Sequence, residues 1–554
     1  MPQPALPTVT RRTALAAAVA ALAWRPARAA DDEGAAADQA LHVLNRLAFG
    51  PAPGDLERVT RMGAPAWIAE QLHPERIALP AFLADQLAAL KTPAQSQRAL
   101  VTQYREALKE VKEAKQAETA GAGAKAAEGG ERRRLIAGIA LEAGQARLLR
   151  ALNSPRQLEE VLVDFWFNHF NVYEGKGLVR VLAESYEREA IRPHVLGRFR
   201  AMLGASAKHP AMLFYLDNWL SVAPGYQPRR GGGKAASGLN ENYAREVMEL
   251  HTLGVDGGYT QQDVTELARI LTGWTLLPQQ ARRRRVAIDG GDATASGHGD
   301  SIFAFDPERH DDGPKTWLGH RVAPAGQMEG EFALDVLARH PATAKHIATQ
   351  LARRFVADAP PPALVARLAQ RFLDTDGDLL AVLQALVDSP EFRDPRPTKF
   401  KTPYQYVLSA VRASGITATN VRPLMATLAQ LGQPLYGCQT PDGWKDTEAD
   451  WLNPNAITQR VNFATALASG RLPLQRVDDP SADAGPGLKA MQREADRAAA
   501  KDMAVEGSTP PVDAAGVLAT LGPAISDKTR AAIAGSPSTL QAALVLGSPD
   551  FMRR

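Results

Sequence analysis

The stretch "LNENYAREVMELHTLGVDGGYTQQDVTELARILTGW" (Leu239–Trp274) shows most clearly how this chain folds. In each half, apolar residues recur every three or four positions, which is the period of an amphipathic helix. The first half predicts a helix over Asn240–Leu253 that ends at Gly254, because glycine readily adopts the left-handed conformation found at helix ends. In the second half, Thr260 and Asp263 have the spacing of a capping box that begins another helix.

The same helical period dominates the rest of the chain, and strand-like alternation is scarce. One exception, "SIFAFDPERHDDGPKTWLGHRV" (301–322), predicts a small β-hairpin in which Ile302–Phe305 pairs with Thr316–Val322. We therefore expect a mainly α fold, with one large multi-helix domain, a small β-hairpin insert and long flexible loops. Small or charged residues accumulate in the predicted loops at 119–131, 223–238 and 282–300.

The composition along the chain suggests four regions. Residues 1–30 are predicted to be a signal peptide and residues 31–477 the main helical domain. Residues 478–512 are rich in Ala, Asp, Gly and Pro, which is typical of a flexible insertion or linker. Residues 513–554 are predicted to be a carboxyl-terminal helical extension that packs on the main domain.

The predicted signal peptide contains "TRRTALAAAVAALAWRPARAA" (Thr10–Ala30). An arginine pair, a short apolar run and a small-x-small site follow each other there, as in peptides of the twin-arginine type. Ala14 stands where that signal usually has a bulky residue, so the general secretion route remains an alternative. No other run approaches about 18 apolar residues. We expect a periplasmic or extracellular protein whose mature chain has no membrane span.

Charge and cysteine content exclude several classes of protein. The 554 residues carry a formal charge of +3. Outside the first 30 residues, which hold four arginines and no acid, 60 basic residues face 61 acidic ones. A chain this balanced lacks the basic surface of a nucleic-acid-binding protein. Cys438 is the only cysteine, which excludes an intrachain disulfide and a cysteine-rich metal site.

Polar residues on the first predicted helix fall into two groups. Glu241, Arg245 and Glu249 recur every four residues and predict an exposed ladder of ion pairs. Glu246 instead falls within the apolar arc, flanked by Asn242 and Glu249. Carboxylates on apolar faces are rare unless they are paired or bind a metal. Glu246 is therefore the predicted acid/base or metal ligand.

Two histidines also lie on apolar helix faces. In "DFWFNHFNV" (164–172), His169 occupies the middle of the apolar face and Asn168 its edge. His169 is either a core histidine bonded to a backbone carbonyl or a catalytic or ligand residue. His251 lies roughly 140° around its helix from Glu246, too far for one ion to bind both directly.

The segment "DPERHDDGPKT" (306–316) offers ligands for a divalent cation. His310 and Asp311, together with Glu246 and Glu249, form the predicted metal set. The alternative is a hairpin loop in which Asp and Gly serve turn geometry. Trp444 and Trp451 either stack on sugar rings or fill the core beneath a loop.

The motifs quoted above resemble those of the bacterial domain of unknown function 1800 (DUF1800) family, and they occur in order over nearly the whole mature chain. The resemblance implies a mainly helical, exported protein, and it places His169, Glu246, His251 and His310 in segments that match family motifs. Members are often encoded beside exported sulfatase-like proteins, and the family has no established activity. Further matching segments are "LNRLAFGPAPGDLERV", "HPATAKHIATQLARRFV" and "WLNPNAITQRVNF".

The chain lacks Gly-x-Ser-x-Gly, the phosphate-binding Gly-x-x-x-x-Gly-Lys and His-Glu-x-x-His, which disfavours serine esterases, nucleotide hydrolases and the common zinc proteases. Our first hypothesis is a metal- or carboxylate-dependent hydrolase of an extracellular polymer or conjugate, with Glu246 and His169 as catalytic residues. The second is a non-catalytic binding or maturation partner of the sulfatase-like protein. A third is a polysaccharide-binding module that uses Trp444 and Trp451.

Overall fold

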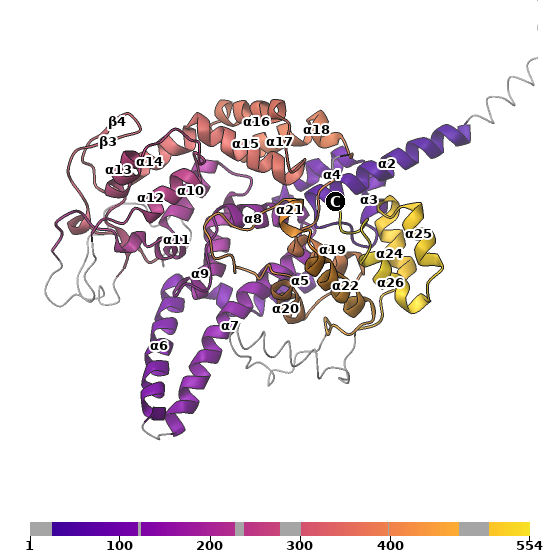
Figure 1. Cartoon of the computed structure of the whole chain (residues 1–554), viewed down its shortest axis with the longest axis horizontal. Helices are drawn as coiled ribbons and strands as arrows, with labels where there is room; N and C mark the ends of the chain where they lie inside the picture. The colour runs from indigo at the N-terminus through magenta and orange to yellow at the C-terminus, as the bar shows by residue number, and fades with distance from the viewer. Residues whose placement is uncertain (1–24, 120–122, 228–237, 278–300, 397, 476–508) are drawn as a thin grey trace, which may run out of the picture.

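The computed structural model describes residues 25–119, 123–227, 238–277, 301–396, 398–475 and 509–554 (Figure 1). Helices dominate these residues, and the strands form two small two-stranded antiparallel sheets. The mainly α prediction is confirmed. The described part of the chain contains no helix that is both long enough and apolar enough to span a membrane. Most of the predicted insertion 478–512 and the whole loop 282–300 lie outside the described residues, as do residues 1–24 of the predicted signal peptide.

The amino-terminal helices end in a long helical hairpin. Helices α6 and α7 pack against each other along this hairpin and extend away from the body of the molecule (Figure 1). The bounds are α2 (Arg25–Leu47), α3 (Asp55–Met62), α4 (Ala64–Gln71), α5 (Ala81–Ala88), α6 (Gln97–Thr119) and α7 (Gly123–Asn153).

The middle of the chain forms the part of the body that carries both sheets. The helices α15 and α16 pack side by side, and α14 packs on α10. The bounds are α8 (Gln157–His169), α9 (Val179–Tyr186), α10 (Phe199–Lys208), α11 (Pro210–Tyr215), α12 (Asn242–Glu249), α13 (Gln261–Ile270), α14 (Gln327–Arg339), α15 (Pro341–Phe355), α16 (Pro362–Asp374), α17 (Leu379–Val387) and α18 (Pro390–Arg393).

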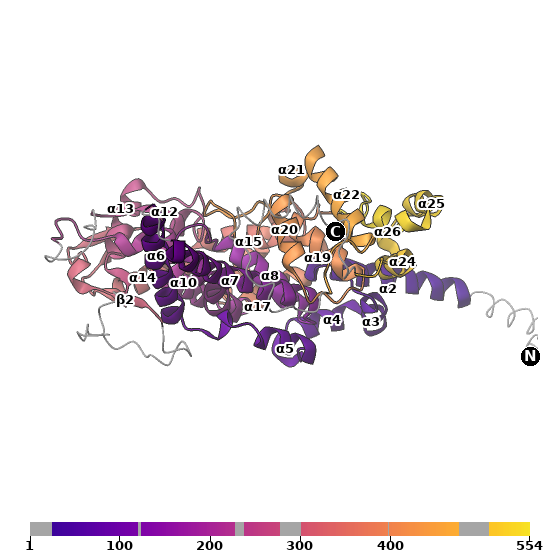
Figure 2. The same cartoon turned by 90° about the horizontal axis from the view of Figure 1, so that it is seen from below.

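The carboxyl-terminal helices return to the amino-terminal ones. Helix α26 packs on α22, α24 packs on α3 and α19, and the end of the chain lies near α2 and α3 in both views (Figures 1 and 2). Helix α19 is buried along its whole length. The bounds are α19 (Pro403–Ala413), α20 (Arg422–Gln430), α21 (Glu448–Trp451), α22 (Pro454–Ala468), α24 (Ala514–Leu521), α25 (Asp527–Ala534) and α26 (Ser538–Leu546).

The predicted strand pairing is wrong. Strand β2 (Phe303–Phe305) pairs with β1 (Trp274–Leu276), and β3 (Lys315–Trp317) pairs with β4 (His320–Val322). The second pair is a tight hairpin because Leu318 and Gly319, which join its strands, have φ angles of 45° and 78°. Two positive φ angles in a two-residue loop match the twist of the strands on either side.

The helix predicted over Asn240–Leu253 is shorter in the structure, where α12 ends at Glu249. The Thr252 hydroxyl donates to the Val247 carbonyl, which satisfies one carbonyl of the last turn. The chain then turns at Gly254, whose φ is 85°, as its predicted role requires. The capping box of Thr260 and Asp263 at the start of α13 is confirmed.

Candidate functional site

The Glu246 side chain lies half-buried on α12. Among the described residues, no hydrogen bond or ion pair engages its carboxylate. Burial raises the pKa of Glu246, and the charge of Glu249 raises it further. Arg245 lowers this pKa, and the charge of Asp442 raises it by less than Arg245 lowers it. The structure therefore surrounds Glu246 with conditions that favour its protonated form.

Asp442 reaches this place because α8 holds the loop that carries it. The Asn168 amide donates to the Trp444 carbonyl at 2.8 Å and accepts from the Trp444 N–H at 2.7 Å. The Asn171 amide donates to two further carbonyls of the same loop. Gly443 has φ 68°, and a Cβ there would lie 2.3 Å from the Asn168 carbonyl oxygen. Asn168 thus fixes the position of the loop that carries Asp442.

The environment of Asp442 lowers the pKa of its carboxyl group, whereas that of Glu246 raises the pKa of its own. Burial alone would raise the pKa of Asp442, but hydrogen bonds from Lys445 and Thr440 outweigh it and lower that pKa. The Lys445 ammonium lies 2.6 Å from the Asp442 carboxylate. Two carboxyl groups whose pKa values are pushed apart can act as an acid and an ionised partner at the same pH.

Two tyrosines border the carboxylates. The Tyr259 hydroxyl donates to Glu249 at 3.2 Å, and burial together with the Glu249 charge raises the pKa of Tyr259 to about 12. Burial, Cys438 and then Glu246 raise the pKa of Tyr215, whose hydroxyl donates to a backbone carbonyl at 2.8 Å. Both phenols remain neutral donors at neutral pH.

The predicted ion-pair ladder forms only at its first step. Arg245 and Glu241 are 3.5 Å apart, and Arg245 also donates to Gln261 at 2.7 Å. Glu249 bonds to a tyrosine instead, so its charge stays beside Glu246. Asn242 is exposed, and its side-chain amide donates to the Leu216 carbonyl.

His169 makes the contact that the core interpretation predicts. Its Nε2 lies 3.1 Å from the His251 carbonyl oxygen, and the Nε2 of His346 lies 3.1 Å from the Leu250 carbonyl oxygen. The three imidazole rings are neighbours, with centroids 6.1 Å apart for His169 and His251 and 5.9 Å for His169 and His346. Two histidines thus satisfy carbonyls just beyond α12, and His169 acts as a support for the helix that carries Glu246.

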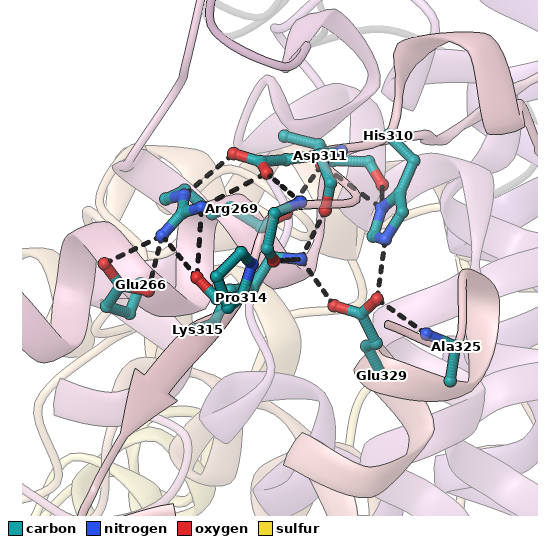
Figure 3. A network of polar contacts seen from close by, with 10 residues as sticks. Glu266, Arg269, His310, Asp311, Pro314, Lys315, Ala325 and Glu329 are labelled. Atoms are coloured by element: carbon teal, nitrogen blue, oxygen red, sulfur yellow. Dashed lines mark hydrogen bonds and ion pairs between the residues drawn. The ribbon is translucent and has the colours of Figure 1, made fainter. Parts of the chain in front are cut away.

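His310 and Asp311 belong to a separate buried network (Figure 3). The two ring nitrogens of His310 face the Thr272 carbonyl at 2.9 Å and the Glu329 carboxylate at 3.0 Å. The Thr272 hydroxyl also lies 3.3 Å from the Nδ1 atom of His310, so both ring nitrogens are engaged inside the protein. The Lys315 ammonium lies 2.7 Å from the other oxygen of Glu329.

Asp311 is the second carboxylate of this network. It accepts two hydrogen bonds from Arg269, at 2.8 and 3.2 Å, and Arg269 also pairs with Glu266 at 2.8 Å (Figure 3). The structure therefore uses the donor and acceptor atoms of His310 and Asp311 to join β3, α13 and α14. Sequence reasoning missed this role because Glu329 and Arg269 lie outside the His-Asp segment.

The structure does not assemble the predicted metal set. Within the residues that the structure describes, no group of three or more His, Cys, Asp or Glu side chains could hold a metal ion. The two tryptophans likewise do not form an exposed platform. Trp451 is buried, its indole N–H donates to the Lys445 carbonyl at 2.7 Å, and Trp444 packs against the core.

Sequence reasoning also missed Asp442. Its signal is the Pro-Asp-Gly turn at 441–443, which indicates a sharp loop but not the helix beside it. The site that emerges consists of Glu246 and Glu249 from α12, Asp442 from the loop and the two bordering tyrosines. We call these five residues the carboxylate cluster.

The model of one protein family, described as "Protein of unknown function (DUF1800)", matches residues 42–553. The match covers nearly the whole chain, so the chain belongs to this family. Neither a search of the curated proteins nor a search of the solved structures gives a match.

Proposed function

We propose that this member of the DUF1800 family is a carboxylate-dependent hydrolase, with Glu246 as the general acid and Asp442 as its ionised partner. The observation that supports this proposal most strongly is the opposed perturbation of the two carboxyl groups. Burial and the negative charges of Glu249 and Asp442 raise the pKa of Glu246 in spite of Arg245, whereas hydrogen bonds stabilise Asp442 as an anion. Acids and bases of hydrolases are poised in this way.

In the proposed reaction, Asp442 accepts a proton from water while the water oxygen attacks the substrate. Glu246 donates its proton to the leaving oxygen, and proton exchange with solvent then restores both carboxyl groups. The substrate we propose is an extracellular polymer or conjugate, and the signal-like segment Thr10–Ala30 supports that compartment.

The test is a panel of chromogenic glycosides, sulfate esters, phosphate esters and acyl esters, assayed with wild type, Glu246→Gln and Glu241→Gln. Glu241 is the matched control, because it lies next to α12 and is held by Thr265 and Gln261. We expect Glu246→Gln to lower the rate by about 10²- to 10⁴-fold and Glu241→Gln to leave it within a few fold. Equal rates for wild type and Glu246→Gln, or a folded wild type inactive on every class, would count against the proposal.

The second candidate function is a non-catalytic exported partner of a sulfatase-like protein. The α6–α7 hairpin favours it, because this arm leaves the body and carries the exposed apolar side chains Leu108 and Leu135 (Figure 1). A Leu108→Asp variant that no longer co-purifies with such a protein, yet remains folded, would support this role. Unchanged co-purification, or none with wild type, would argue against it.

A further inference from the structure

A small cavity lies where the last turn of α2 meets the residue Arg554, away from the carboxylate cluster. It measures about 10 Å³, which is room for one water-sized particle. Side chains from four helices and from the end of the chain line it, among them Asn45 of α2, Val161 of α8, Arg354 of α15, Gln405 of α19 and Arg554.

Lys401 also lines this cavity. Among the described residues, its ammonium has no anionic partner. The residue is 4% exposed. Its ammonium lies 3.8 Å from the centre of the Phe551 ring, and within the described residues it donates no hydrogen bond. Burial lowers the pKa of Lys401 well below its usual value, and the charges of Arg460 and Arg554 lower it further. An anion beside Lys401 would supply the missing counter-charge and favour its ammonium form.

Three other polar side chains around the cavity have buried N–H groups without a hydrogen-bond acceptor. Arg354 Nε, Gln405 Nε2 and Arg554 Nε are buried and have no hydrogen-bond partner in the structure. All three residues line the cavity. Buried donors of native proteins are nearly always satisfied, so three at one cavity indicate an occupant that accepts hydrogen bonds.

Charge favours an anion over water as that occupant. Arg354 lies 2.9 Å from Asp164 and 3.5 Å from Asp446, and Arg554 shares Asp446 at 3.8 Å. Asp164 also pairs with Arg147 at 2.8 Å, so these two carboxylates face three arginines and neither is left to balance Lys401. A water molecule would also need acceptors for its own protons, whereas the unsatisfied side-chain atoms that line the cavity are donors.

We propose that this cavity binds one monatomic anion, chloride, held by the Lys401 ammonium and by N–H groups of Arg354, Gln405 and Arg554. The volume excludes phosphate and sulfate, which have five atoms. Because the lining comes from α2, α8, α15, α19 and the end of the chain, the ion joins both ends of the fold. Chloride binding therefore raises the free energy of unfolding, and above the Kd this increase grows with the logarithm of the chloride concentration.

The experiment uses the full chain in two parts. Crystals grown in sodium bromide should show an anomalous peak in the cavity. Thermal unfolding in sodium chloride, with gluconate keeping the ionic strength constant, should show a midpoint that rises by about 1 °C per tenfold increase in chloride above its Kd. Lys401→Met should abolish this dependence, whereas the control Lys345→Met, which changes an exposed lysine on α15, should retain it.

The bromide measurement decides the matter even if Lys401→Met fails to fold, because it needs only wild type. A cavity without an anomalous peak overturns the proposal whatever the melting data show, since any chloride effect would then arise elsewhere. A wild-type midpoint that is equal in chloride and gluconate overturns the stabilising role. Neither result bears on hydrolysis at Glu246, which lies in the separate carboxylate cluster.

Discussion

Replacing Glu329 by glutamine tests the role of the buried network that joins α14 to the sheet region. Glu329 is 1% exposed, and its carboxylate accepts from Lys315 at 2.7 Å, His310 at 3.0 Å and the Ala325 N–H at 2.9 Å. The side chains of Glu329 and Lys315 are both 0% exposed. Glu329→Gln keeps the shape of the side chain but removes the negative charge that the buried Lys315 ammonium faces.

Breaking a buried ion pair by removing one partner costs about 3–5 kcal/mol. The Lys315 ammonium would keep its hydrogen bonds to the Gly313 and Asp311 carbonyls, so its loss is partial. We therefore expect Glu329→Gln to lower the free energy of unfolding by about 3 kcal/mol, the lower end of that range. Urea unfolding at pH 7, followed by circular dichroism, measures it. The control is Glu70→Gln, which breaks an exposed pair with Arg58 and should cost less than about 1 kcal/mol.

The pH dependence gives an independent check. Burial would raise the pKa of Glu329, but hydrogen bonds from Lys315 and His310 outweigh it and lower that pKa. A carboxyl group whose pKa is lower in the folded state contributes stability above its unfolded pKa and loses it as pH falls through the folded value. The difference in the free energy of unfolding between wild type and Glu329→Gln should therefore become smaller as the pH is lowered. A cost no larger than that of Glu70→Gln, or a gap that widens in acid, would refute the reasoning.

Three further predictions concern the carboxylate cluster and its supports. Glu246→Gln should raise the free energy of unfolding at pH 7 by roughly 0.2–0.5 kcal/mol, because it removes repulsion between Glu246 and Glu249. This gain should disappear at low pH, and urea titrations at the two pH values measure it. Gly443→Ala should destabilise by about 1–3 kcal/mol, because φ is 68° and the new Cβ would meet Asn168, and it should also lower hydrolysis. Burial and then the charge of His346 lower the pKa of His251 to about 3. The free energy of unfolding should therefore decrease by about 1.4 kcal/mol per pH unit as pH falls below 6.5, because the unfolded state binds the proton first. Urea titrations should show a smaller decrease for His251→Gln.

The sequence was sufficient to predict the helical class and the place of Glu246 on its helix, because both follow from local periodicity. It could not show that the charge of Asp442 acts on Glu246, since Asp442 stands on a loop that Asn168 holds from a distant helix. The same limit applies to His310, whose partner Glu329 comes from α14. Long-range packing thus decided which polar residues were satisfied internally and which were left available.

The strand error has a local cause of a different kind. Alternation correctly marked Phe303–Phe305 as a strand, but its partner Trp274–Leu276 follows a helix and is only three residues long. Three residues are too few for alternation to be recognised. The positive φ of Leu318 was equally hidden, because leucine rarely adopts that conformation.

The central claim, that Glu246 is held as a proton donor, is tested most directly by titrating its carboxyl group. Wild type labelled with ¹³C at the glutamate side-chain carboxyl carbon would be followed by NMR from pH 3 to 9, and Glu246→Gln would identify the resonance. Our account predicts an apparent pKa clearly above the ordinary glutamate value of about 4.3, lowered toward it when Asp442→Asn removes a neighbouring charge. A Glu246 resonance that titrates at or below the ordinary value would contradict it.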